Sequence, residues 1–336
     1  MKRHGITAAV LAVALAGLIA HVGAACTGFA VYSGRTLYGA NFDYPPNEIR
    51  FSIEEHETGA VFLGSFLMDN YYAYTVGMNE HGLFSSDQMV SPPRATVDEP
   101  AEDEMFIWNA FYDGLRECES VDEVVTWIGD RRLVQYQSFQ LHNLYADPTG
   151  NAMVVECGAT GNVITEIEGP FIVMTNFHNG DFRGLPLDDI AGDGAERYRV
   201  AYRYIEQNVA AFDVEHGLEV LRRVSMATGS FKTRYSVVFD PQALEIYVAL
   251  ERDYEHIWKV SLTDQTIETY RGFDDHHVLP LDESGITGPT LQAYAPLPLE
   301  PEPPVVVEEA ARPRWPLLAL IGAGILGAVL LLLLKR

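Results

Sequence analysis

Cys26 is the residue of this sequence best placed to do chemistry, because of what precedes it. A basic N-terminus and an apolar stretch over residues 6–22 lead to Gly23-Ala24-Ala25. A basic start, an apolar centre and small residues are typical of a secretory signal peptide. Cleavage after Ala25 would leave Cys26 with both a thiol and a free α-amino group. These groups titrate near about 8.5 and about 8, so the amine can serve as the base for the thiol nucleophile.

Two other interpretations of the N-terminus stay open. The apolar stretch could remain as an uncleaved membrane anchor. A cysteine after small residues also fits a lipoprotein, although Gly23 stands where a lipoprotein signal normally has Leu. Lipidation would cap Cys26 and leave a non-catalytic lipoprotein or binding module.

The C-terminus has the pattern of a membrane anchor. Residues 317–334 are apolar and uncharged, and a span of about 17–25 such residues crosses a bilayer. Trp315 lies where an interfacial aromatic residue belongs, and Lys335-Arg336 fit a cytoplasmic end. We predict a transmembrane helix within 315–336. A buried core helix and a sorting signal clipped after export are the alternatives.

A Pro- and Glu-rich segment separates this anchor from the rest of the chain. Residues 284–314 have little periodicity and are typical of a semi-rigid stalk. The predicted organisation is therefore a signal peptide (1–25), a folded domain (26–283), a stalk (284–314) and an anchor (315–336). It predicts a domain on the periplasmic or extracellular face of the cytoplasmic membrane, held by a single-pass helix.

Composition excludes several classes of function. Apolar residues make up 48% of the chain, as in a globular protein. The formal net charge of −24 argues against a nucleic-acid partner, because phosphate contacts need Lys and Arg. No CxxC pair or His/Cys cluster has zinc-ligand spacing, so we predict neither a metal nor a cofactor.

Hydrophobic patterns predict a single α+β domain. Alternating segments predict strands over residues 26–92, 139–175 and 235–260, and helical periodicity covers 102–131 and 194–227. Ser120 and Glu123 form a capping-box pattern at a helix start. The turn 148–151 predicts a hairpin between two of the central strands.

Several motifs, in order, add a family resemblance to this pattern. The motifs are Cys26-Thr27-Gly28-Phe29, the run 38–45 (YGANFDYP), the run 78–83 (MNEHGL), the run 142–147 (HNLYAD) and Met174-Thr175-Asn176. Together they resemble the choloylglycine hydrolase family of N-terminal-nucleophile (Ntn) hydrolases, which includes bile-salt hydrolases and penicillin V acylases. Asp43 follows Cys26 by 17 residues, as the family pattern requires. The resemblance covers most of 26–260 and implies a four-layer αββα sandwich.

The resemblance also implies roles for individual residues. Cys26 would attack the carbonyl carbon of a linear amide and form a thioester, and Asp43 would orient its amine or thiol. Asn176 matches the family's oxyanion-hole Asn. Gln88 is our candidate for the second oxyanion donor, with Asp87 and Met89 as alternatives.

A late arginine near the site is a further family feature. Arg234 is our candidate for it, and Arg199 is the second choice. Ala40 departs from the pattern, because bile-salt hydrolases and penicillin V acylases have Arg there. Arg35 or Arg50 could supply the charge instead. The departure raises acyl transfer as an alternative to hydrolysis.

The sequence therefore predicts an exported, membrane-anchored amidohydrolase that acts on an N-acyl amide. Tyr71, Tyr72, Tyr74 and Phe177 are candidates for an apolar acyl pocket. Cys118 and Cys157 form either a disulfide or two buried thiols. A homo-oligomer is compatible with the resemblance.

Overall fold

Two large antiparallel sheets carry most of the described residues. The computed structural model describes residues 26–56, 59–137 and 139–294. Sheet A has the order β13 (Phe171–Met174), β1 (Thr27–Tyr32), β2 (Thr36–Tyr44), β14 (Lys232–Asp240), β15 (Glu245–Leu250), β16 (Asp253–Ser261), β17 (Thr266–Arg271), β18 (Val278–Pro280). Sheet B has the order β12 (Asn162–Glu166), β11 (Ala152–Cys157), β10 (Leu141–Ala146), β6 (Phe84–Met89), β5 (Tyr71–Asn79), β4 (Gly59–Met68), β3 (Ile49–His56), β19 (Ile286–Thr287).

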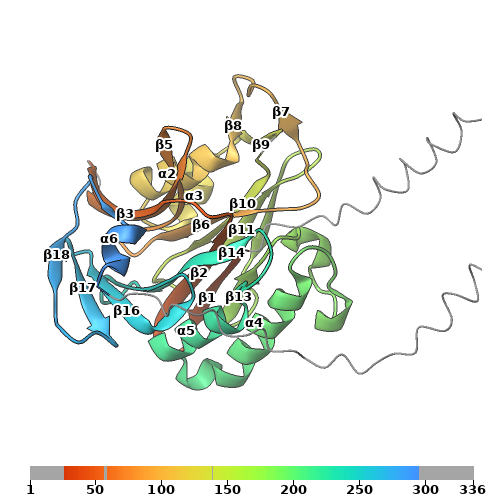
Figure 1. The fold of residues 1–336 in the computed structure, drawn as a ribbon. Helices are drawn as coiled ribbons and strands as arrows, with labels where there is room; N and C mark the ends of the chain where they lie inside the picture. Colours follow the sequence, from red (N-terminus) through yellow and green to blue (C-terminus); the bar gives the residue numbers. More distant parts are fainter. Residues whose placement is uncertain (1–25, 57–58, 138, 295–336) are drawn as a thin grey trace, which may run out of the picture. The chain divides into compact units, whose positions relative to one another are not determined.

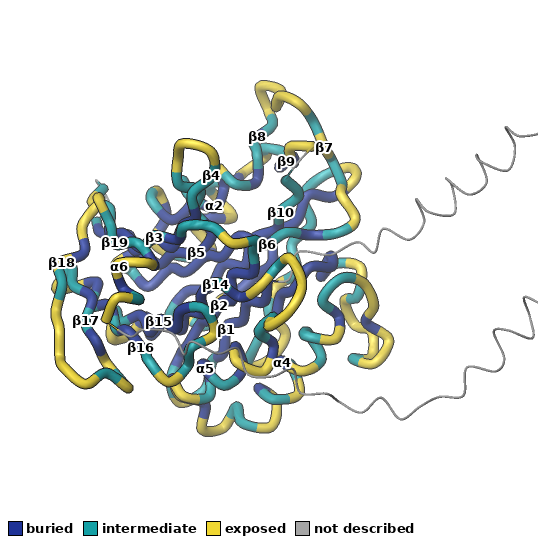
Figure 2. The backbone as a smooth tube through the Cα atoms, in the orientation of Figure 1, coloured by how far each residue is buried: buried dark blue, intermediate teal, exposed yellow. Residues whose placement is uncertain are grey.

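Alternation along the strands explains why the sheets pack face to face. Successive side chains of a strand point to opposite faces. On β1, Ala30 belongs to the core between the sheets, whereas Phe29 belongs to the cluster on the outer face of sheet A. On β4, Phe62 and Leu63 divide in the same way between the central core and the outer face of sheet B. Both faces of each sheet are therefore covered, and the strands are the most buried part of the fold (Figure 2).

Two pairs of helices cover the outer faces. Figure 1 shows α2 (Ile107–Glu117) and α3 (Val121–Ile128) against sheet B, and α4 (Ala195–Asn208) and α5 (Val214–Arg223) on the side of sheet A. The layers follow one another as helix, sheet, sheet, helix. The predicted cap by Ser120 is confirmed, because Ser120 Oγ accepts a hydrogen bond from the Glu123 backbone N–H at the start of α3. The Glu123 carboxylate accepts from the backbone N–H of Glu119 and not from that of Ser120.

Shorter elements complete the described fold. A small sheet joins β7 (Thr96–Val97), β9 (Arg132–Tyr136) and β8 (Glu104–Phe106). Three short 3-10 segments occur at η1 (Asn179–Phe182), η2 (Leu187–Asp189) and η3 (Val209–Ala211). The predicted helical region 102–131 therefore begins with a strand and becomes helical only at Ile107.

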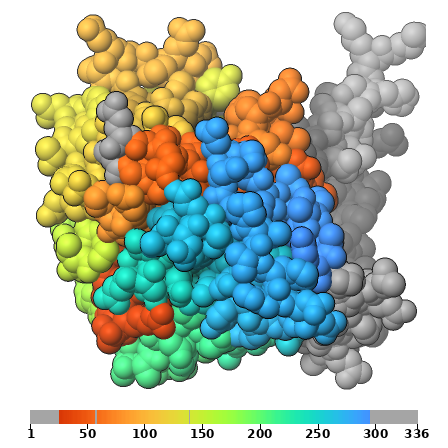
Figure 3. All heavy atoms as spheres, turned by 90° about the vertical axis from the view of Figure 1, so that its left-hand side faces the viewer, coloured from red at the N-terminus to blue at the C-terminus, as the bar shows by residue number. Residues whose placement is uncertain are grey.

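The fold continues beyond the predicted boundary at residue 283. Ile286 on β19 pairs with Phe51 on β3, and α6 (Gly288–Gln292) buries Leu291 in the core between the sheets. Figure 3 shows this blue C-terminal segment beside the orange strands of sheet B. Residues 284–294 thus pack as part of the folded unit instead of starting a stalk, because their apolar side chains have a place in its core.

Three predicted segments lie wholly or partly outside the described residues. They are the signal peptide (1–25), the remainder of the stalk (295–314) and the anchor (315–336). Among the helices of the described ranges, none combines the length and the apolar character needed to cross a membrane.

Candidate active site

Cys26 lies next to Asp43 because of the β1–β2 hairpin. Thr27 pairs with Asn41, so the chain beyond Asn41 runs alongside Cys26. The Cys26 Sγ lies 4.0 Å from the backbone oxygen of Asp43. Both residues are buried, with exposed fractions of 4% and 1%. One turn between adjacent strands therefore brings two of the predicted site residues together.

The Cys26 thiol is held in its protonated form. Burial raises its pKa to about 12, and the negative charge of Asp43 acts in the same direction. Hydrogen bonding by the backbone of Asp43 and Met89 and the charge of Arg197 oppose the shift. A protonated thiol is a weak nucleophile. A nucleophilic role for Cys26 would therefore need a base that removes the proton from sulfur.

Asp43 has one satisfied and one unsatisfied carboxylate oxygen. Its Oδ1 accepts a hydrogen bond from Thr233 Oγ1, whereas its buried Oδ2 has no hydrogen-bond partner among the described residues. Burial raises the pKa of Asp43 to about 7, although the Thr233 hydrogen bond and the charge of Arg197 lower it. Buried polar atoms normally have a partner. The unsatisfied oxygen is suited to a cationic donor, such as the α-ammonium group of a Cys26 at the chain terminus.

Asn176 reaches the site from β13. Gly28 pairs with Met174, so Asn176 comes level with Cys26 two residues further on. Its Oδ1 accepts a hydrogen bond from Arg197 Nη2 at 2.7 Å, and its Nδ2 donates to the Met89 backbone oxygen at 2.6 Å. Because Arg only donates, Arg197 fixes the orientation of the amide. The N–H side of Asn176 therefore faces Met89, whose backbone also hydrogen-bonds the Cys26 thiol.

Arg197 is the site residue that the sequence analysis missed. It lies on the first turn of α4, and its Nη1 donates to the Cys26 backbone oxygen and to Thr27 Oγ1. Burial lowers its pKa, and the charges of Asp43 and Cys26 raise it. Arg197 thus places a positive charge beside both groups and holds the strand that carries the thiol.

The two arginines chosen from the sequence lie elsewhere. Arg234 sits at a register shift of β14 and forms an ion pair with Glu251, with a 2.6 Å separation between nitrogen and oxygen. Arg199 donates to the Ile190 backbone oxygen at 2.7 Å. Within the described residues, neither guanidinium contacts Cys26 or its partners. The β-bulge displaces Arg234, and the helical twist turns Arg199 away from the face that carries Arg197.

Alternation on β6 separates the three candidates for the second oxyanion donor. Asp87 and Met89 line the large cavity that also contains Cys26, whereas Gln88 points to the opposite face of the strand. Gln88 Nε2 instead lies 3.5 Å from Ser86 Oγ and packs against Gly28. The structure therefore brings the backbone of Met89, and not the side-chain amide of Gln88, to the thiol.

Ala40 borders a small cavity together with Asn41, Asp87 and Gln88. Ala40 lies opposite Gly28 on β1, and the amide of Gln88 packs against that strand from sheet B. Arg35 forms an ion pair with Asp240, and the Arg50 guanidinium packs over the ring of Tyr72 at 4.1 Å. Neither supplies the charge that Ala40 lacks. Arg197, on the other side of the thiol, is the cation in contact with Cys26.

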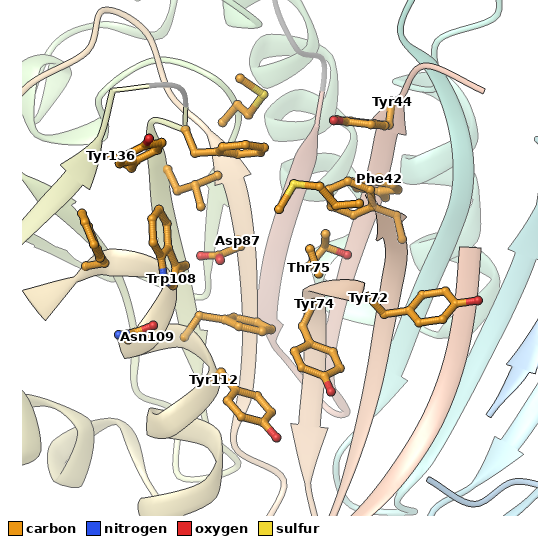
Figure 4. A pocket seen from close by; sticks show the side chains of 18 of the residues that line it. Phe42, Tyr44, Tyr72, Tyr74, Thr75, Asp87, Trp108, Asn109, Tyr112 and Tyr136 are labelled. Carbon is orange, nitrogen blue, oxygen red and sulfur yellow. The ribbon is translucent and has the colours of Figure 1, made fainter. Parts of the chain in front are cut away.

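A cavity of about 550 Å³ opens next to the thiol. Cys26 and Asp43 form part of its wall, and most of the remaining wall is apolar and aromatic (Figure 4). Tyr71, Tyr72 and Tyr74 line it as predicted. Phe177 does not, because it packs against Phe182 and Tyr198 beside α4.

Cys118 and Cys157 are both buried free thiols. Of the two possibilities that the sequence left open, the structure therefore has the unpaired one.

Comparison with known proteins places the fold. No protein-family model matches the sequence, and no curated protein matches it. Among solved structures, a conjugated bile acid hydrolase from Clostridium perfringens is similar, with 17% sequence identity and a TM-score of 0.55 over 77% of this chain and 97% of that one. A penicillin V acylase from Agrobacterium tumefaciens is also similar, with 17% identity and a TM-score of 0.51 over 72% of this chain and 90% of that one. The chain therefore shares the fold of these enzymes, and its order of layers is consistent with the predicted αββα sandwich.

Proposed function

We propose that this protein is a cysteine Ntn amidohydrolase that cleaves a linear amide bond of an N-acyl compound. The observation that carries the proposal is a buried carboxylate on the residue that contacts the Cys26 thiol. The backbone oxygen of Asp43 lies 4.0 Å from Cys26 Sγ, and its buried Oδ2 has no hydrogen-bond partner among the described residues. Asn176 and Arg197 complete the group, of which Cys26 and Asp43 line an apolar cavity. The chain shares its fold with a conjugated bile acid hydrolase and a penicillin V acylase, and this supports a hydrolase that acts on an amide.

The first half of the reaction forms a thioester. The α-amine of Cys26 takes the thiol proton while Sγ attacks the amide carbonyl carbon. Asn176 Nδ2 and the backbone N–H of Met89 donate to the negative oxygen of the tetrahedral intermediate and stabilise it. The amine then gives its proton to the leaving nitrogen, the C–N bond breaks, and the acyl group remains on sulfur.

The second half releases the acid. The α-amine takes a proton from water, whose oxygen attacks the thioester carbon. Collapse of the second tetrahedral intermediate breaks the C–S bond, and the proton returns to sulfur. Asp43 is the group that would hold the ammonium form of the amine in both halves, since its buried Oδ2 has no other hydrogen-bond partner among the described residues. Arg197 orients Asn176 for both intermediates.

This chemistry requires a free amine at Cys26, and the proposal therefore includes removal of residues 1–25 on export. The C-terminal segment would then hold the domain at the outer face of the membrane. Both steps rest on the sequence pattern of the two termini.

The test begins with the N-terminus of the full chain purified from membranes. Intact mass and N-terminal sequencing are expected to show a chain that starts at Cys26. Release of amine from a panel of N-acyl amides then measures hydrolysis. Cys26→Ala is expected to lower turnover about 10³-fold or more, with an unchanged melting temperature.

The matched control is Cys118→Ala, which removes another buried thiol on the far side of sheet B and should retain activity. Full activity of Cys26→Ala, or a lipidated Cys26 in the active protein, would refute the proposal. Acyl transfer to an added amine, in place of hydrolysis, would assign the same nucleophile to a transferase.

A further inference from the structure

Asp87 is a buried acid without a partner in the wall of the cavity. It lies on β6 and is 7% exposed. Its Oδ1 has no hydrogen-bond partner among the described residues. Figure 4 shows the carboxyl group projecting into the cavity, with Trp108 and Thr75 on either side in this view. The reaction described above does not use this group.

Burying an unpaired carboxyl group is costly, and none of the described residues is seen to offset that cost. Loss of water alone raises the pKa of Asp87 well above its usual range, and no positive charge counters it. A buried polar group without a compensating hydrogen bond or charge destabilises the fold. A ligand that brings a positive charge would supply the missing counter-charge.

The charged groups of the cavity all have one sign. Asp43, Asp87 and Asp98 line it, and the described lining contains no Lys, Arg or His. A substrate with a carboxylate or sulfonate group would meet no basic side chain in the described lining. The cavity therefore selects against anionic substrates and favours cationic ones.

Aromatic rings surround the same space. Phe106 and Trp108 stack with ring centroids 4.3 Å apart, and Tyr136 packs edge-on against Trp108 at 6.2 Å. Tyr74 and Tyr112 stack at 4.8 Å on another part of the wall. Aromatic faces attract cations, and a cage of such rings is a known receptor for quaternary ammonium groups. An acid among aromatic rings suits an organic cation better than a metal ion, which needs several oxygen ligands.

We propose that the substrate carries a cationic nitrogen, which Asp87 pairs with and the surrounding aromatic rings enclose. That the bound cation belongs to a substrate rests on the proposed function. As a statement about binding, it stands on the cavity alone. Asp87 is then the residue that determines specificity, and the substrate class is an amide with an amine or quaternary ammonium group.

Binding of two isosteric probes to the full chain tests the inference without catalysis. The probes are (4-hydroxyphenyl)trimethylammonium and 4-tert-butylphenol, which have nearly the same shape and differ by one positive charge. Isothermal titration calorimetry is expected to show about tenfold tighter binding of the ammonium compound. Equal binding, or tighter binding of the neutral compound, to the wild-type chain would overturn the inference.

Two matched variants assign the effect to one side chain. Asp87→Asn keeps the shape of the residue and should bring the ratio of the two affinities close to one. Asp98→Asn removes the same charge from an exposed position of the wall and should leave the ratio unchanged. An unchanged ratio in Asp87→Asn would show that the preference comes from the overall negative charge, and would refute the role of Asp87.

Two N-acyl amides, one ending in a trimethylammonium group and the other in a tert-butyl group, then separate this inference from the proposed function. If neither amide is cleaved while the ammonium probe binds as expected, the cation site stands and the hydrolase assignment fails. If both are cleaved with equal kcat/KM, the hydrolase stands and the specificity assignment fails.

Discussion

At the scale of single residues, Arg197 carries the least replaceable contacts of the site. It bonds the carbonyl of Cys26, the hydroxyl of Thr27 and the amide of Asn176. Arg197→Met would release the Asn176 amide and remove the charge that lowers the pKa of Asp43. We expect kcat to fall about 100-fold or more, with a smaller change in KM, because oxyanion-hole losses have that size.

Arg199→Met is the matched control for this prediction. Its guanidinium bonds Ile190 on the other side of α4, so kcat should stay within about threefold of wild type. Steady-state kinetics on the same amide measure both variants, and their melting temperatures show whether either has unfolded. Equal loss in both variants would mean that α4 contributes only stability.

These contacts also show what the sequence could and could not reveal about the site. Cys26, Asp43 and Asn176 were identified because each lies in a short sequence motif on or next to a predicted strand. Arg197 lies on a helix with no such motif, but it precedes Ala201 and Ile205 at intervals of four residues. A buried helix face that begins with an arginine was therefore visible in the spacing. The displacement of Arg234 by a bulge was not, because bulges depend on the neighbouring strand.

At the scale of elements, the long strands were predictable and the short ones were not. The strands near residues 36–44 and 235–240 alternate clearly, because each has a core face and a helix face. β8 and β9 belong to a small parallel sheet, and neither has a long alternating pattern. Their pairing is decided by contacts between distant parts of the chain, which outweigh local preference.

Glu156 on β11 links several elements behind Asn176. Its Oε1 lies 3.2 Å from His142 Nδ1 and accepts a hydrogen bond from the Asn179 backbone, and His142 Nε2 lies 2.6 Å from the Thr175 backbone oxygen. Burial would raise the pKa of Glu156, but hydrogen bonds from His142, His178 and the Gly180 backbone lower it to about 2. The ionised form is therefore the one that holds the end of β13 in place.

This pKa predicts a loss of stability in acid. Because the folded pKa lies below the unfolded value of about 4.3, Glu156 stabilises the fold fully above that value. The contribution, about 3 kcal/mol, is lost as the pH falls from there towards 2. Glu156→Gln should therefore be less stable than wild type at pH 7, and the difference should shrink below pH 4. Chemical denaturation at several pH values measures this.

Glu168→Gln is the control, because Glu168 is a largely exposed carboxylate paired with Arg183. Exposed ion pairs contribute about 0–1 kcal/mol, so this variant should track wild type at every pH. A Glu156→Gln variant with a constant deficit at all pH values would show that packing, and not charge, is what Glu156 supplies.

At the scale of the whole molecule, the C-terminal part of the described chain closes the space between the sheets. β19 adds a strand to the edge of sheet B, and α6 inserts Leu291 into the central core, where it is fully buried. The composition of residues 284–314 hid this, because the Pro- and Glu-rich part outweighs a short apolar segment. A strand of two residues is stabilised only by its pairing with another strand. The sequence pattern does not show which strand that is.

This arrangement predicts where the folded domain can be cut. A chain that ends at residue 294 should melt as the full chain does, whereas one that ends at 283 should lose the edge strand and the core side chain together. Burial of a leucine alone is worth about 2–5 kcal/mol, so the melting temperature of the shorter chain should fall by several degrees. Leu291→Ala in the full chain should reproduce part of that loss, and Leu185→Ala, at an exposed position, should not. Equal melting of the two truncated chains would mean that the core is complete without α6, and that residues 284–294 belong to the stalk after all.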